Sequence, residues 1–440
     1  MATRPRVVIV GAGFGGLAAA QRLEAEAVDV TLVDQRNYHT FLPLLYQVAT
    51  SGLNTADVAY AVRGIFQRQQ RVSFRQARVS GIDLDAQQVE LDGEDPLPYD
   101  HLVVAAGSAV HYFGVRGGAE HSFPLYTLED AIRLRNHVLT QFEAADADHR
   151  LLDEGALTFV VVGGGPTGVE VAGALAELVD HVLRKDFHTL DVSRARIVLI
   201  EQAPQLLTPF SPKSQRYAMR TLEARGVEVR LGAAVAEVTP THVRLGDGEV
   251  LPTRTLVWAA GVKAGPVAEE LGERGVRLGR GGRIVVGDDL GIPGHPTAYA
   301  VGDIADIADG KGGALPQLAQ VAIQGGRHAG AQIMATIERR PRTPFHYLDK
   351  GTMATIGRRA AVAEFPTGQK LTGPVAWLAW LALHLVYLLG VRNKVSVFVN
   401  WAWNYLTWDR GPRLIINPPR REPADADELP GEAAPGTPRR

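Results

Sequence analysis

The sequence contains no cysteine among its 440 residues. That absence excludes structural disulfides, thiolate metal sites, iron–sulfur ligation and every redox mechanism that depends on a thiol, and we expect no metal site. An excess of one charge sign is also absent. Because the formal net charge is −2, no whole-chain field attracts nucleic acid. Hydrophobic residues make up 46% of the chain, which is enough for the packed cores of two or three domains.

The first glycine-rich turn follows a predicted buried strand, residues 7–10. A helix over residues 17–27 and a second strand over residues 30–33 complete a βαβ unit. In such a unit the glycines let the backbone turn tightly and approach a pyrophosphate, and the helix N-terminus offers N–H groups to the phosphates. A carboxylate that ends the second strand can accept a hydrogen bond from a ribose hydroxyl. The predicted dinucleotide contacts are Gly11, Gly13, Phe14, Gly15, Gly16 and Asp34.

A second copy of this pattern begins near Leu157. It comprises a strand over residues 159–162, another glycine-rich turn, a helix over residues 166–183 and a strand over residues 196–200. Each copy continues into short alternating strands and a final strand that ends in the letters AAG. We therefore predict an α/β fold with two Rossmann-like dinucleotide-binding units. The second copy contributes Gly163, Gly165, Gly168 and Glu201 as predicted contacts, and the two AAG ends add Gly107 and Gly261.

Two units permit two dinucleotides, a transient donor and a resident carrier. A carboxylate at Glu201 accepts from a ribose 2′-OH but repels a 2′-phosphate, which favours a dinucleotide without that phosphate in the second unit. A later predicted strand, residues 298–301, ends in Gly302 and Asp303, where a carboxylate could bind a ribityl hydroxyl. The aromatic segment 37–52 has weak periodicity. It is either buried loop packing or a wall of the cofactor pocket.

These motifs together resemble the two-dinucleotide flavoprotein family. The resemblance rests on an N-terminal GxGxxG with an acidic strand end, a central GGGxTGxE and a late strand that ends in GD. It implies that FAD binds the first unit and the late GD segment, and that NAD(P)H binds the central unit. The implied FAD domain comprises residues 1–150 and 283–345, with residues 151–282 inserted as the NADH domain.

A reduced flavin passes its electrons onward. Without cysteine, the acceptors that remain are a quinone, a small redox protein or oxygen. Residues 315–326 predict a helix that begins near Pro316, with Gln320 and Gln324 on one face because they are four residues apart. Their amides could bind the carbonyls of a quinone, although ordinary helix surface is the default role for glutamines. Leu318 in the same segment is a predicted cofactor contact.

The C-terminal region favours a membrane quinone as the acceptor. Residues 371–391 carry no charge, but a helix over residues 374–389 would be roughly 24 Å long, short of the about 30 Å hydrocarbon core. An amphipathic segment over residues 395–408 has basic flanks, which suit a helix that lies in the bilayer interface. A buried dimerisation surface, and hence a homodimer, is the alternative. Tryptophan favours the lipid headgroup region of a membrane. The C-terminal region of the chain contains five tryptophans, Trp377, Trp380, Trp401, Trp403 and Trp408.

Three further stretches resemble type II NADH dehydrogenases: AQVAIQ at residues 319–324, KGTMATIGR from Lys350 and NWAWNYLTWDRG from Asn400. The resemblance implies that FAD is bound non-covalently, that NADH and quinone approach opposite flavin faces, and that residues 346–417 dock on the membrane without proton pumping. It also makes Glu170 part of the route to quinone protonation, whereas capping of its helix is the simpler role. Lys394 is a weaker candidate partner for Glu170.

Our leading hypothesis is therefore an NADH:quinone oxidoreductase that transfers a hydride from NADH to FAD and two electrons on to a membrane quinone. We expect it at the cytoplasmic face of the cell membrane, with residues 418–440 as a disordered tail. Two alternatives stay open. One is an NADH-dependent reductase of a small redox protein, which would not need the Trp-rich anchor. The other is an FAD-bound redox sensor that turns over slowly.

Overall fold

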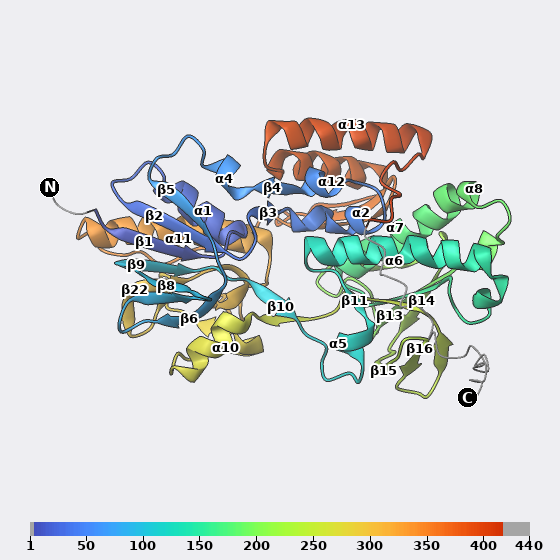
Figure 1. Ribbon diagram of the computed structural model, residues 1–440, viewed down its shortest axis with the longest axis horizontal. Coiled ribbons are helices and arrows are strands. Elements are labelled where there is room, and N and C mark those ends of the chain that lie inside the picture. The colour runs from blue at the N-terminus through green and yellow to red at the C-terminus, as the bar shows by residue number, and fades with distance from the viewer. Residues whose placement is uncertain (1–3, 417–440) are drawn as a thin grey trace, which may run out of the picture.

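Two β-sheets with mainly parallel strands form the body of the protein, and Figure 1 shows the two sheets side by side. The computed structural model describes residues 4–416. In the first sheet all neighbouring strands are parallel except the edge pair β21–β22. In spatial order its strands are β21 (Gly291–Ile292), β22 (His295–Ala300), β9 (His101–Val104), β1 (Arg6–Val10), β2 (Asp29–Asp34) and β5 (Val72–Gln76).

The second sheet is parallel throughout. Its strands in spatial order are β11 (Phe123–Pro124), β18 (Thr255–Trp258), β12 (Thr158–Val162), β13 (Arg196–Glu201) and β14 (Val227–Leu231). The order β18-β12-β13-β14 repeats the order β9-β1-β2-β5 of the first sheet. All strands of the second sheet lie in sequence between β9 and β21, so the second unit is inserted into the first. The predicted α/β fold with two Rossmann-like units is confirmed.

Each unit also carries a small antiparallel sheet, as the alternating segments predict. The first unit has β6 (Val79–Asp83), β7 (Gln88–Leu91) and β8 (Glu94–Pro98), and the second has β15 (Val235–Val238), β16 (His242–Leu245) and β17 (Val250–Pro252). The chain crosses between the units at β10 (Ser108–Val110) and returns at β19 (Val262–Ala264), and these two strands pair with each other.

The helices that follow the glycine turns are α1 (Phe14–Leu23) and α7 (Pro166–Leu178). The start of α1 differs from the predicted residue 17, because Gly13 is its N-cap and the last two turn glycines are already helical. It ends at Leu23, where the chain must turn to enter β2. The predicted extent of the second helix is right, since α7 continues as a π-helix over Val179–Leu183.

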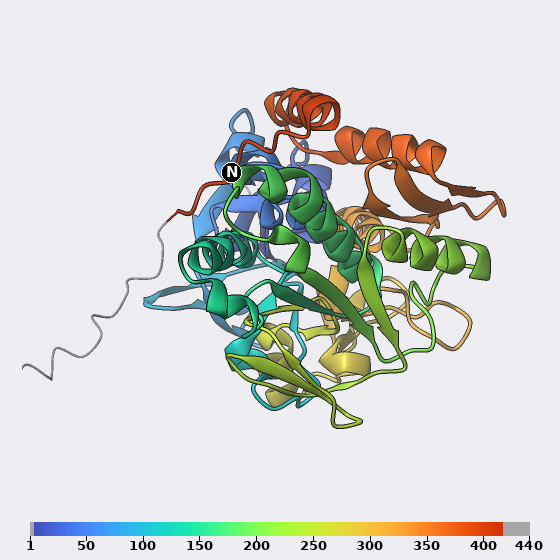
Figure 2. The ribbon, with the colours of Figure 1, turned by 90° about the vertical axis from the view of Figure 1, so that its right-hand side faces the viewer.

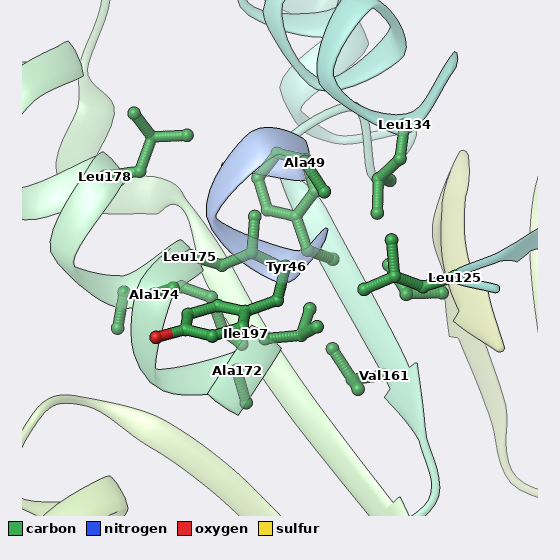
Figure 3. Packing of buried hydrophobic residues seen from close by; sticks show 14 of the residues in the cluster. Tyr46, Ala49, Leu125, Leu134, Val161, Ala172, Ala174, Leu175, Leu178 and Ile197 are labelled. Carbon is green, nitrogen blue, oxygen red and sulfur yellow. The ribbon is translucent and has the colours of Figure 1, made fainter. Parts of the chain in front are cut away.

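The aromatic segment 37–52 is more ordered than its periodicity indicates. It forms β3 (Tyr38–Thr40), a 3₁₀ turn over Leu42–Leu44 and α2 (Leu45–Ala49), and β3 pairs with β4 (Ala59–Ala61). Although α2 precedes the second unit in sequence, it packs on α6 (Leu128–Ala147) and α7. Figure 3 shows its Tyr46 among alanines and leucines of α7. Residues 37–52 of the first unit thus pack into the hydrophobic core of the second unit.

Other short elements complete the two units. They are α3 (Thr55–Val58), α4 (Val62–Ile65), α5 (Gly118–His121), α8 (Arg184–Asp186), α9 (Pro212–Glu223), α10 (Pro266–Glu273), β20 (Ile284–Val285), β23 (Ala305–Asp306) and the 3₁₀ turn η6 (Gly302–Ile304). The helix predicted to begin near Pro316 is α11 (Ala319–Ile337), whose N-cap is Leu318. It starts later than predicted, and the side-chain amide of Gln317, which precedes the helix, donates to the carbonyl of Asp303 at 3.0 Å.

The C-terminal region lies across both units, at the top of Figure 1 and again in Figure 2. An antiparallel sheet of β24 (Thr352–Gly357), β25 (Ala360–Glu364) and β26 (Lys370–Thr372) packs on α7. The helices α12 (Pro374–Tyr387) and α13 (Val391–Thr407) follow. Over residues 4–416, no helix combines the length and apolar character needed to cross a membrane. The predicted tail, residues 418–440, lies outside the described residues.

The tryptophans of this region do not share one environment. Trp380 and Trp401 are buried and pack near Tyr46 of α2, so these two belong to the core and not to a headgroup layer. Trp403 is exposed. The outer face of α12 and α13 is apolar, with exposed Val375, Leu378, Leu383, Val386, Val391, Val395, Phe398, Val399, Trp403 and Leu406.

Candidate functional site

Asp34 closes the first glycine turn from the end of β2. Its Oδ2 accepts from the backbone N–H of Ala12 at 2.7 Å, and its Oδ1 accepts from that of Arg36 at 2.8 Å. Burial raises the pKa of Asp34, and these two N–H groups oppose the shift. The carbonyl of Ala12 in turn accepts from His39 Nδ1 at 2.9 Å. Since each carboxylate oxygen keeps a free lone pair, the group can still accept from a ribose hydroxyl.

Glu201 repeats this arrangement at the end of β13. Its carboxylate accepts from the backbone N–H of Gly164 and, at 2.6 Å, from that of Ala203. In both units the strand-end carboxylate therefore accepts from two backbone N–H groups. One belongs to the residue that follows the first turn glycine, and the other belongs to the residue two positions after the acidic residue. The interval between turn and acid, which is longer in the second unit, does not change the contact.

The turn glycines divide into two physical roles, which are the same in both units. A Cβ on Gly16 would lie 1.8 Å from the carbonyl oxygen of Gly11, and a Cβ on Gly168 would lie 1.8 Å from that of Gly163, so only glycine fits. A Cβ on Gly13 or Gly165 would have no heavy atom within 4 Å. Both are N-caps without a side-chain cap, so open space and free N–H groups coincide. This arrangement fits a pyrophosphate.

The N-terminus of α11 meets the first glycine turn. A Cβ on Gly326 would lie 2.1 Å from the carbonyl oxygen of Gly15, and a Cβ on Gly15 would lie 3.4 Å from the carbonyl oxygen of Ala322 and 3.2 Å from Val301. The turn, the end of β22 and the start of α11 are therefore one compact site.

Asp303 lies in this site with a hydrogen-bonded pair of hydroxyls. Ser108 Oγ donates to Asp303 Oδ2 at 3.0 Å, and Ser108 Oγ and the Tyr126 hydroxyl are 2.6 Å apart. Burial raises the pKa of Asp303 and of Tyr126. Gly107 adjoins the pair, since its Cβ would lie 3.7 Å from the Tyr126 hydroxyl. Sequence reasoning missed both hydroxyls. Ser108 directly follows AAG and could have been found, whereas Tyr126 carries no local signal.

The two glutamines of α11 have different surroundings. Gln320 Oε1 is buried and has no hydrogen-bond partner among the described residues, so it is an acceptor open to a ligand. Gln324 is engaged, because it donates to the carbonyl of Leu348 and accepts from its N–H, both at 3.0 Å. Leu318 is exposed beside Gln320. Of the predicted pair, Gln320 alone has its amide oxygen free for a ligand.

Glu170 lies on α7 beneath the C-terminal region. Its Oε1 accepts from the N–H of Thr355 at 3.3 Å. Burial raises the pKa of Glu170 to about 8, and Thr355 and the Trp380 indole offset part of the shift. Glu170 is therefore mostly protonated at neutral pH. Lys394 is not its partner, since the ammonium donates to the carbonyl of Val386 at 2.8 Å and stabilises the end of α12.

Aromatic rings connect the glycine turn with the surroundings of Glu170. Phe14 contacts His39 at 4.9 Å and Phe41 at 5.8 Å between ring centroids, and Phe41 contacts His384 at 6.1 Å. His384 stacks on Trp380 at 4.0 Å. In the second unit Gly261 lies under the ring of Phe113, which is 61% exposed. Mostly buried rings thus connect the first glycine turn to the surroundings of Glu170, whereas the ring beside Gly261 is exposed.

The paired turns define a class of protein. The family model described as pyridine nucleotide-disulphide oxidoreductase matches residues 5–326, and that described as NDH2 C-terminal domain matches residues 350–408. The solved NDH2 from Plasmodium falciparum in complex with NADH has a TM-score of 0.85 at 19% identity and covers 94% of this chain and 100% of its own. The sulfide:quinone oxidoreductase of Aquifex aeolicus has a TM-score of 0.70 at 19% identity and covers 89% and 92%.

Sequence relatives narrow the class to a family. The type II NADH:quinone oxidoreductase NdhA of Mycobacterium tuberculosis is 42% identical over 430 residues, which cover 94% of this chain and 90% of the relative. The type II NADH:quinone oxidoreductase of Staphylococcus aureus (strain NCTC 8325 / PS 47) is 32% identical over 82% and 89%. This chain belongs to the type II NADH:quinone oxidoreductase family. The resemblance inferred from the AQVAIQ segment and the C-terminal motifs is confirmed.

Proposed function

We propose that the protein oxidises NADH with a quinone, NADH + H⁺ + quinone → NAD⁺ + quinol, by way of FAD bound in the first unit and without proton pumping. The observation that carries this proposal is the pair of matched glycine turns, each braced by a carboxylate and open at its second glycine. One unit can hold a resident dinucleotide while the other exchanges NADH for NAD⁺. The names of the relatives support the overall reaction.

FAD is assigned to the first unit because polar groups suited to all its parts converge there. The open space at Gly13 suits the pyrophosphate, and Asp34 suits the adenosine ribose. Ser108 and Asp303 offer a hydroxyl and a carboxylate to the ribityl chain. The free amide oxygen of Gln320 suits a ring N–H donor of the isoalloxazine. Bound FAD would supply a carrier that takes two electrons from the nicotinamide and gives them to the quinone.

NADH is assigned to the second unit, with its pyrophosphate at Gly165 and its ribose at Glu201. Structural similarity to an NDH2 in complex with NADH supports NADH as the dinucleotide that the protein uses. The carboxylate of Glu201 already accepts two backbone N–H groups, and its remaining lone pairs can accept from a 2′-OH. A 2′-phosphate beside it would bring two negative charges together, so NADH is the expected donor.

The quinone is expected under α12, whose Trp380 indole adjoins the carboxyl group of Glu170. A protonated Glu170 within reach of the reduced quinone can supply a proton, and its raised pKa suits this role at neutral pH. The match of residues 350–408 to the NDH2 C-terminal domain favours a quinone over a small redox protein as acceptor.

The exposed apolar face of α12 and α13 supports docking on a membrane, where the quinone dissolves. Apolar side chains project outward from both helices, and an exposed apolar patch of this kind marks either a membrane or a protein contact. We place the protein at the cytoplasmic face of the cell membrane. A homodimer that buries the same face is the alternative.

Reconstitution tests this function. Purified protein loaded with FAD and added to liposomes that contain a quinone should oxidise NADH and form quinol in equal amounts, with NADH preferred to NADPH. If NADH bleaches the flavin but quinone does not restore its absorbance, the proposed acceptor is wrong. If NADH does not bleach the flavin, the proposed donor is wrong as well.

A further inference from the structure

A cavity of about 40 Å³ lies between α2, α7, the β24–β25 turn and the end of α13. This volume holds one or two water molecules. Many of its walls are polar, which favours water inside it. The polar side chains that line it include Tyr46, Gln47, Glu177, Thr355, Tyr405 and Arg410.

Tyr46 lines this cavity and is a buried residue. Its ring is buried against Ala172 and Ala174 of α7, as Figure 3 shows. Gln47 Nε2 donates to the Tyr46 hydroxyl at 2.8 Å, and Gln47 Oε1 accepts from the indole of Trp401, also at 2.8 Å. Since the amide occupies one lone pair of the hydroxyl oxygen, the phenolic hydrogen remains available for another acceptor.

The inner end of the cavity adjoins Glu170. Thr355 lines the cavity, and its N–H is 3.3 Å from Glu170 Oε1. The ring of Tyr46 also contacts Trp380, whose indole stabilises the Glu170 carboxylate. Burial raises the pKa of Tyr46, and the negative charge of Glu170 raises it further. Tyr46 and Thr355 therefore both line the cavity and both adjoin the surroundings of Glu170.

The outer end of the cavity is lined by half-buried and charged groups. Arg358 and Asn404 are half-buried there, while Glu177 and Arg410 pair at 3.1 Å. Tyr405, also half-buried, follows inward, and burial raises its pKa too. Arg358, Asn404 and Tyr405 are therefore partly in solvent on this side of the cavity, whereas the Glu177–Arg410 pair is buried.

We propose that this cavity carries the solvent proton to Glu170, with the hydroxyls of Tyr405 and Tyr46 as successive relays. The proposal rests on the proposed function, in which each NADH oxidised by quinone consumes one proton. Each hydroxyl breaks its O–H bond toward the inner acceptor and forms a new one from the outer side, so neither is changed by a turnover. Their high pKa values suit this role, because neither needs to exist as a phenolate.

The surroundings leave few other entrances. The outer face of α12 and α13 is apolar, and hydrocarbon in contact with it would carry no protons. From α12, His384 stacks on Trp380, but its ring is neutral at neutral pH because burial lowers its pKa to about 4, and its Nδ1–H donates to the carbonyl of Trp380 at 2.7 Å. Glu177 is held by Arg225 and Arg410.

Tyr46→Phe and Tyr405→Phe test the relay in the FAD-loaded full chain on quinone-containing liposomes. Bleaching of the flavin by NADH should stay within about twofold of wild type. Quinol formation should slow by about tenfold or more, and its solvent isotope effect in D₂O should rise. Tyr99→Phe is the control, because Tyr99 is buried like Tyr46 but does not line the cavity, and its hydroxyl lies 3.5 Å from the carbonyl of Asp83.

A second variant fills the cavity without removing a hydroxyl. Ala174 lines the cavity, and Ala174→Val would take up part of its volume and leave less room for water, so quinol formation should slow as in Tyr46→Phe. Wild-type rates and isotope effects in the Phe variants or in Ala174→Val would overturn the relay. If a Phe variant loses FAD, Ala174→Val alone decides. Absence of quinol from the wild-type protein would instead overturn the proposed function.

Discussion

Gly326 of α11 lies directly on the backbone of Gly15 in α1, where a Cβ would come within 2.1 Å of the Gly15 carbonyl oxygen. Side chains do not separate the two helices at this point. The contact fixes the N-terminus of α11, and with it Gln320, against the first glycine turn. It is the reason that the AQVAIQ segment belongs to the dinucleotide site although it follows the turn by some 300 residues.

Gly326→Ala should therefore weaken FAD binding. Overpacking of this kind costs about 1–3 kcal/mol, which corresponds to a dissociation constant raised roughly 5- to 150-fold. The ratio of flavin absorbance to protein absorbance after purification measures the loss. Gly325→Ala is the matched control, because its Cβ would lie 3.5 Å from Leu290 in ordinary contact. Equal flavin content in the two variants would mean that the helix contact does not position the site.

Arg410 should contribute strongly to stability. Its guanidinium donates to Glu177 at 3.1 Å and to the carbonyls of Thr50 and Ala174 at 2.8 and 3.2 Å, so it ties the C-terminal region to α2 and α7. Arg410→Leu should lower the free energy of unfolding by about 3 kcal/mol, near the low end for a broken buried pair, because Arg225 still pairs with Glu177.

Urea denaturation of the FAD-loaded protein measures this loss. Arg254→Leu is the control, because Arg254 pairs with Glu154, whose side chain is 57% exposed, and exposed pairs contribute about 0–1 kcal/mol. A loss no larger in Arg410→Leu than in Arg254→Leu would show that the buried network adds nothing to stability.

Local pattern predicts the two βαβ units well, because each depends on contacts within some 40 residues. The glycine spacing and the acidic strand ends identify Asp34 and Glu201 as predicted ribose contacts, and in the structure both also accept from the backbone N–H that follows the first turn glycine. The longer interval in the second unit is absorbed by the π-helix and the loop after α7.

Contacts between distant segments could not be predicted in this way. Most of the inserted unit separates Tyr126 from Asp303 in sequence, yet Ser108 connects the two through hydrogen bonds. No local sequence pattern indicates this role of Tyr126. Trp380 and Trp401 look like interfacial residues by composition, yet α2 buries them. The apolar character of α2 gave no indication that it packs on the other unit, since burial depends on which surface lies opposite.

Glu201→Gln should reduce the preference for NADH over NADPH. Loss of a hydrogen bond to a charged group costs about 1.5 kcal/mol or more, so KM for NADH should rise about tenfold, while KM for NADPH should not rise. The amide oxygen can still accept from the Gly164 N–H, so the turn should persist and kcat should change little. Gln202→Ala, at the exposed neighbour, is the control. An unchanged NADH:NADPH ratio would remove Glu201 from nucleotide selection.

Charges on the outer face of α13 should abolish membrane binding. Phe398 and Leu406 are 60% and 81% exposed, and burial of each contributes about 1.5–3 kcal/mol. The double variant Phe398→Glu/Leu406→Glu should bind liposomes at least about 100-fold more weakly, with flavin bleaching by NADH unchanged. Val250→Glu, at an exposed valine of β17, is the control. A variant that still binds liposomes but changes from dimer to monomer would identify the face as a subunit contact.

Glu170 should make stability and turnover depend on pH in a defined window. Its pKa is about 8 in the folded protein against 4.5 in the unfolded chain. Below pH 4.5 both states are protonated. Between pH 4.5 and 8 the unfolded state ionises first, so unfolding releases a proton and stability falls as pH rises. Above pH 8 both states are ionised and the loss is complete.

Glu170→Gln removes this dependence, so its stability relative to wild type should increase from pH 5 to pH 9 in thermal denaturation. Glu120→Gln, at an exposed position, should show the same difference from wild type at both pH values. Quinol formation by the wild type should decline above pH 8, where the proton of Glu170 is lost, while the Gln variant should be slower by about 10²-fold without that decline. A stability difference that is equal at pH 5 and pH 9 would mean that Glu170 is ionised in the folded protein and cannot be the proton donor.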